Sequence, residues 1–255
     1  MSTVDLHYET FGTAQPGTSP LVLVHGGAGT IGAHWGGVIP VLAKSRLVVG
    51  VELQGHGHTP HADRPYTFDN SADDIAALVR RLDLGPVDVA GFSNGGPVVL
   101  RLAQKYGDVV RRLVIASGFC RRDGMVPGFW DGFGDAEISS MPTELADAYR
   151  AIDPDPANLK RMFDLDVGLM RDFEDWDLDA LAGIAQPALF VSGVRDVVLP
   201  AHTVDMAASV PRGWSLILPA GHGDYLGAAE TGGTVGAVAK GFFGVLEQFL
   251  DADGL

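Results

Sequence analysis

Gly91-Phe92-Ser93-Asn94-Gly95-Gly96 is the stretch of this 255-residue chain from which its architecture is most readily inferred. It follows the apolar run Val87-Asp88-Val89-Ala90 and precedes Val98-Val99-Leu100-Arg101-Leu102-Ala103, which has helical character. We therefore expect a strand, a sharp turn at Ser93 and a helix. In such a G-x-S-x-G pattern the turn strains the backbone of the serine and exposes its side chain, and the flanking glycines leave room for it.

Apolar runs and helical segments alternate along most of the chain. The predicted strands are Thr3–Phe11 at an edge, Leu21–Val24, Leu47–Val51, the run before Ser93, Leu113–Ala116, Ala188–Val191 and Ser215–Leu218. The predicted helices are Trp35–Ala43, Asp69–Leu84, the segment after Ser93, Ala201–Val210 and a C-terminal helix. This alternation predicts an α/β fold with a mostly parallel twisted sheet and helices on both faces. Ligands of such sheets bind at the carboxyl ends of the strands, where Ser93 lies.

The alternation is interrupted between Ser117 and about Gly183. We expect residues 1–118 and 184–255 to form the core, and residues 119–183 to form a helical cap (lid) inserted into it. Methionines and aromatic residues of the insertion suit an apolar pocket, although cap helices also need such residues for their own packing. Residues 121–180 include 15 acidic and 6 basic residues. A negative lid disfavours anionic substrates unless Arg121 or Arg122 points inward; the alternative is a solvated acidic surface.

Composition excludes several classes of function. The formal net charge of −14 argues against nucleic acid and anionic membranes as partners. Cys120 is the only cysteine, so no internal disulfide can form, which fits a reducing compartment. The N-terminus lacks the pattern of a signal peptide, and no apolar stretch is long enough to span a bilayer. We expect a cytoplasmic protein, monomeric or a small homo-oligomer, without a cofactor.

A serine hydroxyl needs a base to become a nucleophile, and the base needs an orienting carboxylate. His222 lies in a Gly-rich loop after the last predicted strand, where it can reach back over the strand ends, whereas His202 at a helix start is less well placed. Asp196 directly follows the strand before it, and Asp123, after an earlier strand, is the alternative acid. The chain order Ser93, Asp196, His222 is the order expected for a serine in this turn.

These motifs, with His25-Gly26-Gly27 and Gly55-His56-Gly57, resemble those of the α/β-hydrolase family over nearly the whole chain. The resemblance implies that Ser93 is the nucleophile, His222 the base and Asp196 its orienter. It also implies an oxyanion hole formed by the backbone N–H groups of Gly27 and Asn94. His25 would then support the oxyanion loop, and Glu52, where the family usually has aspartate, would support the Gly55–Gly57 turn.

The resemblance implies a serine hydrolase that cleaves a small, largely apolar carboxylic ester through an acyl-enzyme. Other reactions on the same triad are alternatives: lactone, amide, thioester or C–C bond hydrolysis, or cofactor-free perhydrolase or haloperoxidase chemistry. C–C hydrolases typically have asparagine where Phe92 stands. A non-catalytic ligand-binding protein of the same fold is a further alternative. His56-Gly-His58-Thr-Pro60-His61 has the histidine spacing of the metallo-β-lactamase motif, but Pro60 replaces its aspartate, so we expect no metal.

Overall fold

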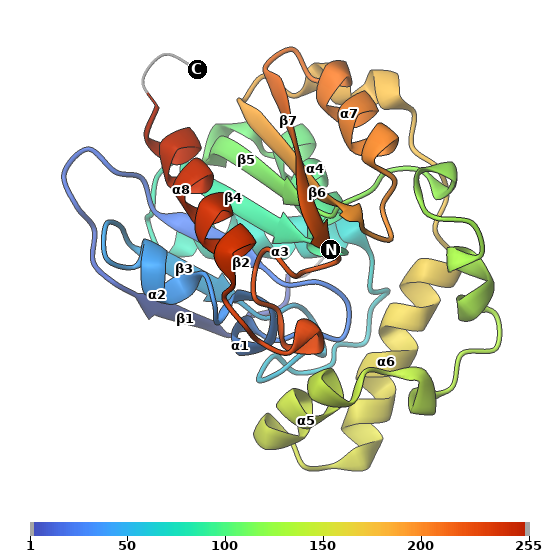
Figure 1. Cartoon of the computed structure of the whole chain (residues 1–255). Helices are drawn as coiled ribbons and strands as arrows, with labels where there is room; N and C mark the ends of the chain where they lie inside the picture. The colour runs from blue at the N-terminus through green and yellow to red at the C-terminus, as the bar shows by residue number, and fades with distance from the viewer. Residues whose placement is uncertain (1–2, 253–255) are drawn as a thin grey trace.

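Seven strands form a single sheet in the order β1-β3-β2-β4-β5-β6-β7 in the computed structural model, which describes residues 3–252 (Figure 1). The strands are β1 (Tyr8–Phe11), β2 (Leu21–Val24), β3 (Val48–Val51), β4 (Val87–Phe92), β5 (Val110–Ala116), β6 (Ala188–Arg195) and β7 (Gly213–Gly221). β1 pairs with β3 in antiparallel fashion at one edge, and all other neighbours are parallel. The predicted mostly parallel α/β sheet is confirmed.

Helices cover both faces of the sheet because adjacent strand residues alternate between two apolar cores. On β2, Val22 and Val24 pack with α3 (Phe68–Arg81), α4 (Gly95–Lys105) and α7 (Pro200–Ser209). Leu21 and Leu23 face the other core, which is shared with α1 (Ile31–Trp35), α2 (Ile39–Leu42) and α8 (Ala237–Asp251). Figure 1 shows α8 in front of the sheet and α3 and α4 behind it.

Several element boundaries differ from the sequence prediction, mainly near the N-terminus. The expected strand Thr3–Phe11 is regular only from Tyr8; at His7, directly before it, the N–H donates to the Thr59 hydroxyl at 2.9 Å. In place of the expected helix Trp35–Ala43 the structure has two short helices, α1 and α2, separated by residues 36–38. Pro40, in the first turn of α2, has no N–H to donate to the preceding turn, and a Cβ on Gly37 would lie 2.4 Å from the carbonyl oxygen of Leu226, so only glycine fits at position 37.

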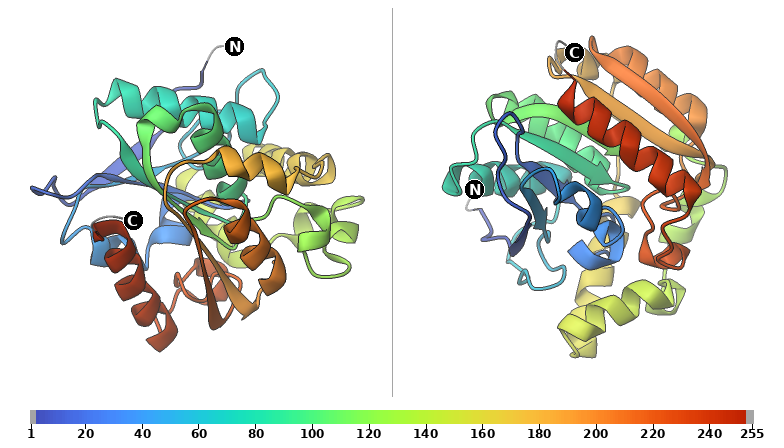
Figure 2. Two further views of the ribbon diagram at one scale, coloured as in Figure 1. Left: turned by 90° about the horizontal axis from the view of Figure 1, so that it is seen from above. Right: turned by 60° about the vertical axis from the view of Figure 1, so that its left-hand side comes forward.

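The segment between β5 and β6 contributes two α-helices and several short 3-10 turns. α5 (Thr143–Ile152) and α6 (Pro156–Arg171) lie outside the layers of the sheet and its helices (Figure 2). Asp155 caps α6 by accepting from the N–H of Ala157 at 2.9 Å. The two helices share a small apolar core made of Met141, Leu145, Ala146, Tyr149, Leu159, Met162 and Phe163, which also includes Ala33 of α1. Within residues 3–252, no helix combines the length and apolar character needed to cross a membrane.

Candidate active site

Ser93 lies at the turn between β4 and α4, at the carboxyl end of a central strand. Its φ of 51° places it in the left-handed region, which costs free energy for any residue with a side chain. The turn is tight enough that a Cβ on Gly91 would lie 2.1 Å from the carbonyl oxygen of Gly95. A Cβ on Gly95 would lie 2.5 Å from the carbonyl oxygen of Val24. Both glycines are therefore required by the close approach of neighbouring backbone.

His222 and Asp196 meet Ser93 at the same edge of the sheet. His222 Nε2 lies 3.2 Å from Ser93 Oγ, and His222 Nδ1 lies 2.7 Å from Asp196 Oδ1. Asp196 also accepts from the Ser117 hydroxyl at 2.5 Å and from the N–H of Gly193 at 3.1 Å. Burial opposes ionisation of Asp196, but these donors and His222 outweigh it and lower the pKa of the carboxyl below its ordinary value. The carboxylate is thus held ionised behind the imidazole.

The alternative residues named from the sequence lie elsewhere. Asp123 is exposed and pairs with Arg121, with both of its oxygens 2.8 Å from the guanidinium. Arg122 stacks over the Trp130 ring at 4.3 Å from its centroid. His202 accepts from the N–H of Cys120 at 3.2 Å, and burial raises the pKa of the Cys120 thiol to about 12. Within residues 3–252, none of these side chains lines the cavity at Ser93.

Two backbone donors flank Ser93 and have no acceptor. Within residues 3–252, neither the N–H of Gly27 nor that of Asn94 donates a hydrogen bond. Asn94 precedes the first residue of α4, so its N–H lies at the positive end of that helix. Gly27 lies close to it, because a Cβ on Gly27 would be 2.9 Å from Asn94 Nδ2. Unpaired N–H groups in a site of this kind are suited to bind a negatively charged oxygen.

The two histidines next to the loop that contains Gly26 and Gly27 are buried and neutral. His25 accepts from the N–H of Leu53 through Nε2 at 3.0 Å, so Nδ1 carries the proton and donates to the carbonyl oxygen of Gly26 at 2.8 Å. Burial lowers the pKa of His25 to about 4. His34 accepts from the N–H of Gly26 through Nδ1 at 2.9 Å, and burial holds its pKa well below the ordinary value. Both rings thereby fix the backbone before Gly27.

A cavity of about 420 Å³ opens over Ser93 and His222. Its outer wall comes mainly from the segment between β5 and β6, through Phe129, Phe133, Met141, Leu145, Phe163, Val167 and Met170. Trp130, Phe173 and Trp176 pack among themselves and against Phe68 or Phe119 instead. Some of the methionines and aromatic residues of this segment therefore line the cavity, and others pack against neighbouring rings.

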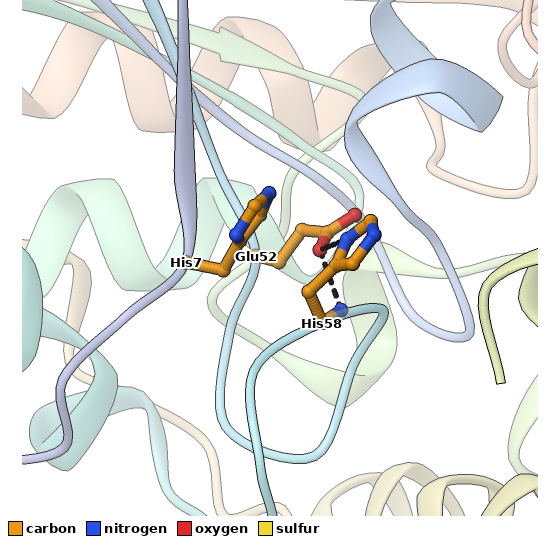
Figure 3. Close-up of side chains that lie close together, drawn as sticks. All are labelled: His7, Glu52 and His58. Carbon is orange, nitrogen blue, oxygen red and sulfur yellow. Dashed lines mark hydrogen bonds and ion pairs between the residues drawn. The ribbon is translucent and has the colours of Figure 1, made fainter.

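The histidines of the alternative metal motif point to different partners. His56 contacts Asp166 on α6, His58 contacts Glu52, and His61 lines a separate cavity near Tyr149. Glu52 instead gathers His7 and His58 around it (Figure 3), a group that could hold a metal ion. However, Glu52 Oε2 already accepts from the backbone N–H of His58 at 2.7 Å and from its Nδ1 at 2.9 Å. These bonds hold the turn after β3, which is the supporting role that the family resemblance implied for Glu52.

Four residues of the site were not singled out from the sequence. Ser117 donates to Asp196, His34 accepts from the N–H of Gly26, and Asp166 and Glu230 line the cavity. Glu230 Oε1 lies 3.5 Å from His34 Nε2, and burial raises the pKa of the Glu230 carboxyl. Asp166 and Glu230 come from segments without a motif of their own. Only their position after folding identifies them.

Comparison with known proteins identifies the family of the chain. A family model described as the alpha/beta hydrolase fold matches residues 19–178. The chain is 33% identical over 149 residues to 2-hydroxymuconate semialdehyde hydrolase of Pseudomonas sp. (strain CF600), an alignment covering 57% of this chain and 47% of that protein. It is 28% identical over 261 residues to pimeloyl-(acyl-carrier protein) methyl ester esterase of Nitrosomonas europaea, covering 88% of this chain and 95% of that protein.

The fold is shared with solved structures. The enol-lactonase from Burkholderia xenovorans LB400 superposes with a TM-score of 0.75 and 21% identity over 98% of this chain and 99% of that one. The chain spans about half the length of several other curated relatives that it matches, between 37% and 61%. Because the family model matches more than half of the residues, the chain belongs to the alpha/beta hydrolase fold family.

Proposed function

We propose that this protein is a serine hydrolase that cleaves a small, largely apolar carboxylic ester, with residues 119–183 as a cap over the site. The observation that carries the proposal is the continuous chain of contacts from Asp196 through His222 to Ser93, at 2.7 and 3.2 Å. It ends beside two unpaired backbone donors and under an apolar cavity. A carbonyl bound there has a nucleophile, a base and oxyanion donors on one side of it.

In the proposed reaction, Ser93 Oγ attacks the ester carbonyl and His222 Nε2 takes its proton. The negative charge that develops on the carbonyl oxygen is bound by the N–H groups of Gly27 and Asn94, each contributing about 3 kcal/mol. His222 then protonates the leaving alcohol, and an acyl group remains on Ser93. Water, activated by His222, attacks this acyl-enzyme and releases the acid. Asp196 keeps the imidazole in the tautomer with the proton on Nδ1.

Hydrolysis of a C–C bond is the second candidate, since a semialdehyde hydrolase is among the relatives with the higher identity. Phe92 precedes the nucleophile in this chain, and its ring lies 4.8 Å from the ring of His222. An asparagine side chain at that position would offer polar groups that phenylalanine lacks. This difference favours the ester over the C–C bond. Lactones are cyclic esters, so the same mechanism applies to them and the same experiment covers them.

The proposal is tested by measuring hydrolysis of 4-nitrophenyl butyrate, a lactone and a C–C cleavage substrate with wild-type protein and Ser93→Ala. We expect ester turnover that falls at least about 10³-fold in the variant. Ser140→Ala is the matched control, since Ser140 lines the same cavity without contacting His222. A fluorophosphonate probe should label wild-type protein at Ser93. Ester turnover that survives in Ser93→Ala would rule out the proposed nucleophile.

A further inference from the structure

Asp166 connects the cap helix α6 with the loop that carries one of the two proposed oxyanion donors. The N–H of Ala28 donates to Asp166 Oδ2 at 2.5 Å. Ala28 has a φ of 55°, an unfavourable conformation for alanine that needs support from its surroundings. The residue directly before it is Gly27, and a Cβ on Gly27 would lie 3.7 Å from Asp166 Cγ. The carboxylate therefore holds the peptide next to the N–H that is to bind the oxyanion.

The charge of Asp166 is balanced by His56, which is completely buried. His56 Nε2 lies 3.0 Å from Asp166 Oδ2, and His56 Nδ1 lies 3.0 Å from the carbonyl oxygen of Gln54. Nδ1 faces a carbonyl oxygen and therefore carries a proton, and a second proton on Nε2 lets the ring donate to Asp166 as well, so these contacts favour the imidazolium form. Burial opposes this charge, but Asp166 and Gln54 together raise the pKa of His56 above its ordinary value. A bare carboxylate beside the oxyanion hole would repel the developing charge, and the imidazolium cancels this repulsion.

The same helix also touches the substrate cavity. Phe163, Val167 and Met170 lie within about one turn of Asp166 on α6 and line the cavity over Ser93. A substrate group that packs against these side chains therefore contacts the same helix that holds the loop at Ala28 through Asp166. Asp166 thus lies on the helix that forms part of the cavity wall and, through Oδ2, contacts the loop at Ala28.

We propose that Asp166 is a positioning residue for the reaction, which fixes the oxyanion loop through Ala28 and makes the oxyanion hole depend on the cap. This inference rests on the proposed ester hydrolysis. It implies that α6 contributes a residue needed to position the oxyanion donor. Contacts between the cap and the substrate should then affect kcat as well as KM.

The test compares Asp166→Ala, Asp166→Asn and Val167→Ala with wild-type protein on 4-nitrophenyl butyrate. Asp166→Ala should lower kcat about 10- to 100-fold with KM within about threefold, because the oxyanion donor is displaced. Asp166→Asn keeps an oxygen that can accept from the N–H of Ala28, so it should recover at least about fivefold of the lost kcat. Val167→Ala, on the same helix and the same cavity wall, should mainly change KM.

An inhibitor pair separates positioning from general damage to the cap. A trifluoromethyl ketone forms an oxyanion on Ser93, whereas the matching secondary alcohol does not. Asp166→Ala should weaken the ketone at least tenfold more than the alcohol, with urea midpoints confirming that each variant is folded. Equal weakening of both inhibitors, or an unchanged kcat, overturns the inference while Ser93-dependent turnover keeps the proposed function. Absence of Ser93-dependent turnover in wild-type protein overturns both.

Discussion

Asp196 acts in the proposed mechanism without touching Ser93, because its effect passes through the His222 ring. It is buried and receives hydrogen bonds from His222, Ser117 and the N–H of Gly193. An amide in its place would present one N–H₂ group where an acceptor is needed. His222 would then adopt the tautomer with its proton on Nε2, which cannot accept the proton of Ser93.

Asp196→Asn should therefore lower kcat for ester hydrolysis about 10³- to 10⁴-fold while the protein stays folded. Asp123→Asn is the matched control, because Asp123 is an exposed aspartate that pairs with its near neighbour Arg121. It should change kcat less than about threefold. Steady-state kinetics on 4-nitrophenyl butyrate measure both. A larger loss for Asp123→Asn would move the orienting carboxylate to the earlier strand.

Ser93, His222 and Asp196 could be named together from the sequence because each follows a predicted strand. In addition, glycines lie close on both sides of Ser93 and of His222. Asp166 could not be predicted in this way. It is one of 15 acidic residues in the segment 121–180, and its contact with Ala28 spans 138 positions of the chain. Ser117 could not be predicted either, since its hydrogen bond to Asp196 depends on the pairing of β5 with β6.

The turn between β4 and α4 is the element on which the site depends most. Gly95 lies against the backbone at the end of β2, where a Cβ would be 2.5 Å from the carbonyl oxygen of Val24 and 2.7 Å from that of His25. Backbone atoms cannot move aside as a flexible side chain can. A methyl group at this position must therefore displace either the turn or β2.

Gly95→Ala should lower the free energy of unfolding by about 1–3 kcal/mol and impair ester turnover, because it separates Ser93 from the segment that leads to Gly27. Gly244→Ala provides the comparison. Gly244 lies within α8, and a Cβ there would contact nothing within 4 Å. This change should stabilise the protein by about 0.5–1 kcal/mol. Urea unfolding checks both, and a stabilising effect of Gly95→Ala would contradict the close approach seen at the turn.

The bounds of some helices and strands were predicted more closely than those of others. The buried strands β2, β3, β4 and β5 were found to within a few residues because their apolar runs are continuous. β7 is longer than the predicted Ser215–Leu218, since this edge strand leaves residues such as Trp214 half-exposed and includes Pro219. α1 and α2 were predicted as one helix because the apolar pattern of residues 35–43 was weighted above Pro40, which lies in the first turn of a new helix.

For the molecule as a whole, the buried neutral histidines link stability to pH. The pKa of His25 is lowered from an ordinary value of 6.5 to about 4 by burial, and that of His34 is also lowered. Between these pH values the unfolded chain binds protons that the folded protein does not. Stability should therefore decrease as the pH falls from about 6.5 towards about 4, by about 3 kcal/mol for His25 alone.

Urea unfolding of wild-type protein and His25→Asn at pH 7.5 and pH 5 measures this effect. His25→Asn should destabilise the protein at pH 7.5, because Leu53 and Gly26 lose their partners, and it should show a smaller decrease between the two pH values. An equal decrease in both proteins would mean that other groups determine the acid sensitivity.

Cys120 gives this chain a practical use in spectroscopy. Its thiol is enclosed and, with a pKa raised to about 12, remains protonated at neutral pH, so maleimides and Ellman's reagent should not modify the native protein. Cysteines introduced on the surface, for instance at Asp147 of α5, can then carry a fluorophore or spin label without removal of the natural one. Release of the Cys120 thiol in rising denaturant would report loss of the interior directly, from a reporter already present in the chain.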